Sequence, residues 1–173
     1  GPGRSATELI AALGRPDGPR ALLVFGSNLR VSAPDANAVT ERLAALDLLV
    51  VADVVPGETA MAADVVLPVA QWAEEEGTMT NLEGRVLRRR RALRPPEGVR
   101  TDLEVISGLA AELGVAGFPA DPRMVFDELR AASAGGPADY SGISYDRLDA
   151  GEALHWPCPA RPPGEEAHPG SPR

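Results

Sequence analysis

Residues 21–28 read ALLVFGSN, residues 48–53 read LLVVAD and residues 65–68 read VVLP. Each segment contains a short, unbroken apolar run, which is typical of a β-strand that is covered on both faces. Helical patterns separate the runs, over residues 35–46 and 58–63. Strands that alternate with helices predict right-handed crossovers and a parallel sheet.

The flanking sequence extends this pattern with further helices. Ser5 and Glu8 form a capping box ahead of an apolar helix face, and Thr101 and Glu104 form a second one. We therefore expect an α/β fold, with a Rossmann-like, three-layer parallel sheet and flanking helices over residues 1–134. Proline and glycine dominate from residue 135 onward. We expect residues 135–173 to form a Pro/Gly-rich extended linker toward a further C-terminal domain.

The composition excludes several classes of protein. The chain has 173 residues and a net charge of −8, which is unlike a protein that binds a phosphate backbone. We therefore expect no nucleic-acid partner. No apolar run approaches the ~20 residues of a membrane span, so we also expect no membrane partner. The one cysteine, Cys158, makes neither an internal disulfide nor a metal cluster by itself. These features fit a cytoplasmic protein.

Two of the predicted strands end in residues that suit ligand binding. Gly26, Ser27 and Asn28 follow the first strand, and Asp53 ends the second. Parallel α/β sheets bind ligands beyond the carboxyl ends of their strands, where an acid can accept from a ribose hydroxyl. The alternative is a plain strand-to-helix turn capped by local Ser and Asn side chains. No Gly-x-Gly-x-x-Gly follows either strand, which disfavours an ordinary nicotinamide-binding fold.

Four motifs, in order, resemble the molybdopterin oxidoreductase family of nitrate reductases and formate dehydrogenases. They are GSN at residues 26–28, GETA at 57–60, ADVVLP at 63–68 and EGTMTNLEGR at 76–85. The resemblance extends over nearly the whole chain. It implies the third of four domains, which holds one guanine dinucleotide arm of a bis-pterin molybdenum cofactor, Mo-bis(molybdopterin guanine dinucleotide).

The resemblance also implies roles for particular residues. Asn28, with Gly26 and Ser27 in its loop, would contact the cofactor, and Ala52-Asp53 would meet the guanosine end. Asp102 matches a further guanosine contact, although an acid in a first helical turn is also favoured by the helix dipole. Two positions depart from the family pattern: Leu29 replaces a proline, and Glu75 replaces a lysine that would face phosphate. We assign no cofactor role to Glu75.

Other charged groups have simpler interpretations. The run Arg88–Arg91 suggests a nucleic-acid patch, but a solvated, charge-guarded edge strand suits an acidic chain better. The run Glu74–Glu76 suggests an acid/base pair or a metal site, but a solvated turn is favoured because no histidine lies nearby in the sequence. We therefore assign no catalytic and no metal-binding residue.

By resemblance, the parent enzyme reduces nitrate, and the alternative substrate is formate. A third hypothesis is a non-catalytic scaffold related to the large subunit of complex I. The family's 4Fe-4S cluster and molybdenum ligand belong to parts of the parent outside this sequence, so we expect no catalysis by this chain alone. The expected partners are the molybdenum cofactor, the remaining domains of the parent and an electron-donor protein.

Overall fold

The computed structural model describes residues 3–160. The chain divides into two compact units, which are described separately below. The first comprises the residues up to 74 together with 93–105, and the second comprises 75–92 and the residues from 106 onward. Every residue that the sequence suggests for cofactor binding lies in the first unit.

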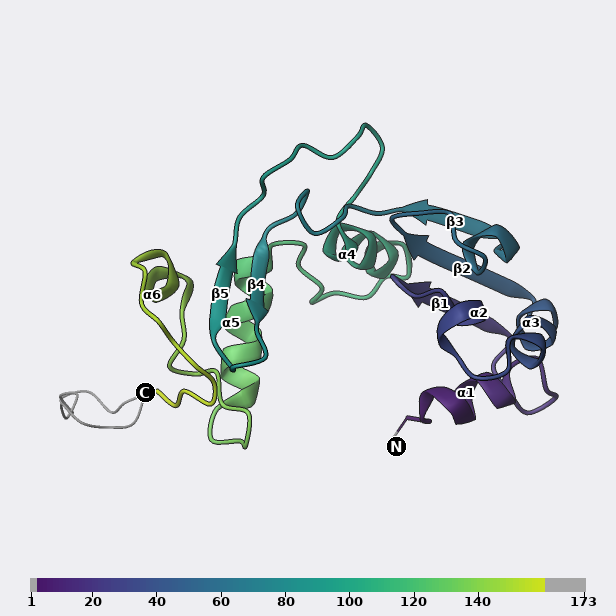
Figure 1. The fold of residues 1–173 in the computed structure, drawn as a ribbon, viewed down its shortest axis with the longest axis horizontal. Helices are drawn as coiled ribbons and strands as arrows, with labels where there is room; N and C mark the ends of the chain where they lie inside the picture. Colours follow the sequence, from purple (N-terminus) through teal and green to yellow (C-terminus); the bar gives the residue numbers. More distant parts are fainter. Residues whose placement is uncertain (1–2, 161–173) are drawn as a thin grey trace. The chain divides into compact units, whose positions relative to one another are not determined.

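A three-stranded parallel sheet forms the centre of the first unit (Figure 1). Its strands are β1 (Ala21–Phe25), β2 (Leu48–Asp53) and β3 (Val65–Pro68), in the order β1-β2-β3. Leu23 pairs with Val50, and Val50 pairs with Val65. The apolar runs of the sequence thus form the predicted strands, and the expected α/β class with a parallel sheet is confirmed.

Helices flank this sheet on the side that carries the core. They are α1 (Ala6–Ala12), α2 (Leu29–Ser32), α3 (Ala36–Ala44) and a 3₁₀ turn, η1 (Ala60–Ala62). The predicted capping box begins α1, because the Ser5 hydroxyl accepts from the Glu8 amide and the Glu8 carboxylate accepts from the Ser5 amide. The core joins the sheet to α3 and to the residue that follows α1 through Val24, Leu49, Val51, Leu13, Val39 and Leu43.

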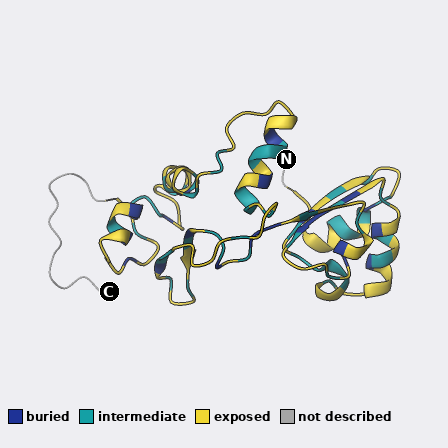
Figure 2. Ribbon diagram, turned by 90° about the horizontal axis from the view of Figure 1, so that it is seen from above, coloured by how far each residue is buried: buried dark blue, intermediate teal, exposed yellow. Residues whose placement is uncertain are grey.

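The opposite face of the sheet is more open. Leu23, Leu48 and Val65 are 48%, 38% and 42% exposed, and burial along the strands is drawn in Figure 2. The strand order accounts for this asymmetry. Right-handed crossovers that run from β1 to β2 and on to β3 in one direction place their helices on one face of the sheet.

The second unit is built on an antiparallel hairpin of β4 (Gly77–Thr80) and β5 (Val86–Arg89). The turn expected at Glu74–Glu76 therefore leads directly into the strand β4. The helices α5 (Pro122–Ser133) and α6 (Tyr145–Asp149) belong to the same unit, and α4 (Asp102–Glu112) begins in the first unit. Val86 and Phe126 form a buried cluster with four residues beyond 135, namely Ile143, Tyr145, Leu148 and Leu154.

Apolar residues beyond 135, as far as residue 154, therefore belong to the core of the second unit. The domain boundary at 134 stays a prediction, and the linker expected over residues 161–173 lies outside the described residues. Among residues 3–160, no helix has the length and apolar character needed to span a bilayer.

Candidate functional site

The carboxyl edge of the parallel sheet collects the residues singled out from the sequence. Gly26, Ser27 and Asn28 follow β1, and Asp53 is the last residue of β2. Because the strands are parallel, both groups lie at the same edge. We call this region, residues 26–30, 52–59 and 100–102, the crest.

Asp102 reaches the crest by a different route. The chain beyond β3 continues through Val69, which bridges in parallel to Arg100. The Ala70 amide donates to the Arg100 carbonyl at 2.8 Å. Asp102 is the first residue of α4 and follows Arg100 by two positions, so α4 begins at this edge. Thr101 and Glu104 form the predicted capping box, at 2.7 and 3.2 Å.

Asn28 is held by the loop that follows β2. Its amide nitrogen donates to the Glu58 carboxylate at 2.5 Å, and its amide oxygen accepts from the Thr59 hydroxyl at 2.9 Å and the Thr59 amide at 3.3 Å. Thr59 is almost fully buried, and its hydroxyl also accepts from the Arg30 amide. Asn28 thus joins the loops that follow β1 and β2. We call Asn28, Glu58 and Thr59 the latch.

Two glycines of the crest are required by its geometry. A Cβ on Gly57 would lie 2.9 Å from the Asn28 amide nitrogen, so a side chain there would displace the latch. Gly26 has a φ of +54°, which favours glycine, and a Cβ on it would meet nothing within 4 Å. The space beside the Gly26 backbone is therefore open to a ligand.

The remaining crest residues differ in what they offer. Ala52 is 1% exposed and its carbonyl accepts from the Gly26 amide, so it presents no side chain to a ligand. Asp53 is half-buried, and one carboxylate oxygen accepts from the Val54 amide at 2.7 Å. Ser27 is half-buried and has no hydrogen bond to any residue in 3–160. Asp53 and Ser27 are thus the crest side chains best placed to receive a ligand.

Glu58 adds negative charge to the crest. The hydrogen bond from Asn28 lowers the pKa of the Glu58 carboxyl below its usual range, with a smaller contribution from the charge of Arg30. Glu58 is exposed, and the Arg30 guanidinium donates to its backbone carbonyl at 3.4 Å. A charged carboxylate at this edge can accept hydrogen bonds from hydroxyl or amino groups of a ligand.

The charged runs of the second unit are paired with one another. Arg89 forms an ion pair with Glu75 at 2.7 Å, and both side chains are only about 20% exposed. The Arg88 guanidinium lies 4.0 Å from the centre of the Tyr145 ring, and Arg90 pairs with Asp149 at 2.8 Å. Glu75 is therefore not a solvated turn residue, and these arginines are bound within the unit. Among residues 3–160, no three His, Cys, Asp or Glu side chains cluster as metal ligands.

The sequence alone assigns no role to Glu58 or Thr59, although both lie inside the GETA motif at residues 57–60. Their signal is the turn sequence GET at residues 57–59, which begins four residues after Asp53, the last residue of β2. Linear sequence does not reveal that Asn28, about 30 positions earlier, faces them. The pairing follows only once β1 and β2 are known to be neighbours.

The chain belongs to the molybdopterin oxidoreductase family. The sequence profile described as "Molybdopterin oxidoreductase" matches residues 1–112. The chain is 42% identical over 173 residues to the assimilatory nitrate reductase catalytic subunit of Bacillus subtilis, covering 99% of this chain and 24% of that protein. It is 42% identical over 139 residues to the F420-dependent formate dehydrogenase subunit alpha of Methanocaldococcus jannaschii, covering 79% of this chain and 20% of that protein.

A solved structure supports the fold. The chain matches the acetylene hydratase of Pelobacter acetylenicus with a TM-score of 0.63 and 21% identity, covering 83% of this chain and 20% of that one. This likeness concerns the fold alone. The chain spans about a quarter or less of the relatives it matches, and its expected membership of the family is confirmed.

Proposed function

We propose that this chain is the part of a molybdopterin-dependent nitrate reductase that holds a guanine dinucleotide arm of the molybdenum cofactor. The observation that carries the proposal is the crest: Asp53, Ser27 and the open backbone at Gly26 meet at the carboxyl edge of a parallel sheet. Ligands of such sheets bind beyond this edge. The cofactor supplies the redox chemistry of the parent, and this chain supplies contacts that bind and orient it.

The residues of the crest fit a nucleotide. The uncovered backbone at Gly26 permits the close approach that a sugar–phosphate chain requires. Asp53 keeps one carboxylate oxygen without a hydrogen bond among residues 3–160, and that oxygen is suited to a ribose hydroxyl. Asp102 lies at the margin, at the beginning of α4. Asn28 contributes by holding the two loops together, since its amide is already bonded to Glu58 and Thr59.

A substitution at Asp53 tests whether the crest binds the cofactor. In the full-length parent, we expect Asp53→Ala to cause partial loss of the cofactor, because one charge-assisted hydrogen bond contributes ~1.5–3 kcal/mol. The matched control is Asp47→Ala, which removes an exposed acid just before the amino end of the same strand. Molybdenum and guanine nucleotide are quantified in the purified proteins. Equal cofactor content in both variants would contradict the proposed contact.

The substrate of the parent rests on similarity. The nitrate reductase relative matches 99% of this chain, whereas the formate dehydrogenase relative matches 79% of this chain. We propose nitrate reduction by a cytoplasmic parent, with an iron–sulfur cluster and an electron donor outside this chain. Formate oxidation is the alternative, because that relative is equally identical over the matched part.

Activity assays of the parent separate the two substrates. We expect nitrate turnover with reduced viologen, and none of formate with a dye acceptor. Formate turnover without nitrate turnover would assign the parent to the alternative. A parent without bound molybdenum would favour the third hypothesis, a non-catalytic scaffold.

A further inference from the structure

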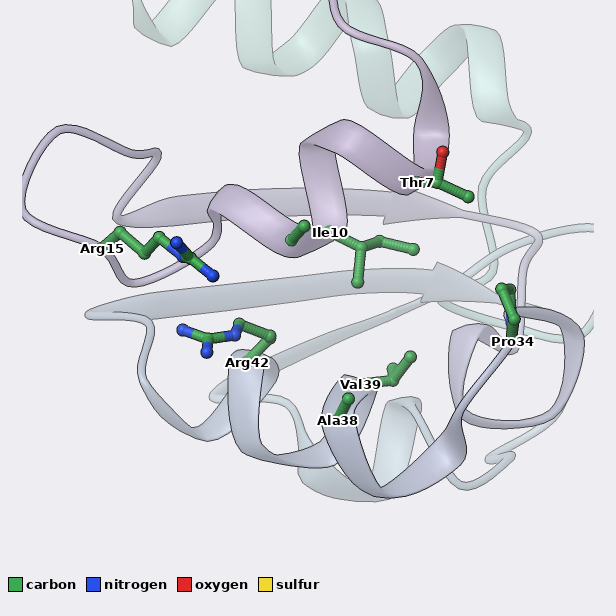
Figure 3. Close-up of a pocket in the computed structure, with 8 residues that line it drawn as sticks. Thr7, Ile10, Arg15, Pro34, Ala38, Val39 and Arg42 are labelled. Atoms are coloured by element: carbon green, nitrogen blue, oxygen red, sulfur yellow. The ribbon is translucent and has the colours of Figure 1, made fainter.

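A pocket of about 270 Å³ lies between α1 and α3, outside the crest (Figure 3). Its wall from α1 is formed by Thr7, Ile10 and Ala11, and its wall from α3 by Ala38, Val39 and Arg42. Arg15 and Pro34 close the two ends. The floor is apolar, since Val39 is 1% exposed and Ile10 packs against the same core.

Two arginines gather at one end of this pocket. Figure 3 shows the guanidinium groups of Arg15 and Arg42 turned toward each other at the end opposite Pro34. Neither guanidinium group has an ion pair or hydrogen bond to any residue in 3–160. Most other arginines of the described chain are paired, for example Arg20 with Asp47 and Arg123 with Asp146. Two like charges that converge without an acid favour an anion between them.

The positive end lies away from the crest. Arg42 lies in the last turn of α3, ahead of the amino end of β2. Arg15 lies in the segment ahead of the amino end of β1. The crest is formed at the opposite, carboxyl ends of these strands. The pocket is therefore a separate site.

We propose that this pocket binds a small aliphatic monocarboxylate, with its carboxylate between Arg15 and Arg42 and its hydrocarbon body on Ile10 and Val39. The pocket volume corresponds to about nine water molecules at ~30 Å³ each. Hexanoate, with about eight heavy atoms, matches this size. The guanidinium groups select the negative charge, and the apolar floor selects a hydrocarbon body over a bare anion. This site is independent of the proposed cofactor site at the crest.

Titration of the 173-residue chain with sodium hexanoate at constant ionic strength tests the proposal. Backbone amide chemical shifts in NMR spectra report binding at Ile10, Val39 and Arg42. We expect saturation with a Kd of about 1 mM, the range that so small a ligand reaches at an open site. Hexylammonium should not bind, and acetate should bind at least tenfold more weakly, because it lacks the hydrocarbon body.

Variants separate charge from shape. Arg42→Gln and Arg15→Gln should each weaken hexanoate binding about tenfold, since each removes a charge-assisted hydrogen bond. Ala38→Leu should block the pocket from an exposed position on α3, whereas Ala44→Leu, also exposed on α3, should not. Arg4→Gln is the charge control. Absence of saturation in the wild-type chain, or unchanged binding in both arginine variants, would overturn the proposal.

Discussion

At the scale of single residues, the latch assigns Asn28 a positioning role. Its amide nitrogen donates to Glu58, and its amide oxygen accepts from Thr59. The expectation that Asn28 itself contacts the cofactor stays a prediction, and its geometry favours an indirect contribution. Exchanging the donor and the acceptor of the hydrogen bond between residues 28 and 58 distinguishes a direct contact with the cofactor from a positioning role.

Asn28→Asp places a carboxylate against Glu58, and the repulsion should lower the Tm of the chain by about 2–4 °C at pH 7. The pKa of Glu58 is lowered in the folded chain. The native contact therefore stabilises the fold at pH values above the usual pKa of a glutamate, and this stabilisation is lost as the pH falls. The difference in Tm between Asn28→Asp and the wild type should therefore shrink toward pH 4. Thermal unfolding followed by circular dichroism at both pH values measures this.

The double variant Asn28→Asp with Glu58→Gln provides the control. The glutamine amide can donate to the new aspartate, which restores the hydrogen bond in the reverse direction. Stability at pH 7 and cofactor retention in the parent should both recover. Recovered stability with persistent cofactor loss would instead show that the Asn28 amide touches the cofactor.

Tyr145 carries a second prediction at this scale. It is 3% exposed, and its hydroxyl has no hydrogen-bond partner in residues 3–160. Burial raises the pKa of this phenol, partly offset by the charge of Arg88. Tyr145→Phe removes an unsatisfied polar group and should leave stability unchanged or raise it by up to about 1 kcal/mol. Urea unfolding measures the change, and a loss above that size would reveal a partner for the hydroxyl.

At the scale of elements, an ion pair links Arg89 of β5 to Glu75, just ahead of β4. Glu75→Lys, which introduces the residue type expected from the family pattern, places a lysine beside Arg89 in a poorly solvated position. The variant should destabilise the fold by about 1–3 kcal/mol. Glu75→Lys combined with Arg89→Glu restores opposite charges and should recover most of the loss in urea unfolding. Equal instability of the single and double variants would contradict a role for this pair.

Local sequence signals predict some of these elements and miss others. The strands β1, β2 and β3 and the capped helices α1 and α4 were predictable, because apolar runs and caps are local signals. The strand β4 was not, because its four residues include one glycine and two threonines and resemble a turn. The carboxyl-edge position of Asn28 and Asp53 was also predictable, whereas the latch required the pairing of distant loops.

At the scale of the whole molecule, the open face of the parallel sheet predicts association. Leu23, Leu48 and Val65 lie exposed on a sheet type that is normally covered on both faces. We expect the isolated chain to self-associate as its concentration rises, which sedimentation velocity measures. Leu23→Lys should weaken association by placing a charge on this face, while Val31→Lys, at an exposed apolar residue of α2, should not. Concentration-independent sedimentation of the wild type would contradict this expectation.

The two sheets also differ in the length of chain that each must close. Ala21 pairs with Leu48 only after the chain has passed through α2 and α3, whereas Thr80 pairs with Val86 across a short turn. Local hairpins close in about 1–10 μs, while pairing between distant segments must first overcome loop-closure entropy. During refolding, amides of the hairpin should therefore gain protection from hydrogen exchange before those of the parallel sheet. The crest joins the loops after β1 and β2, so the proposed nucleotide-binding surface can form only in the later of these two events.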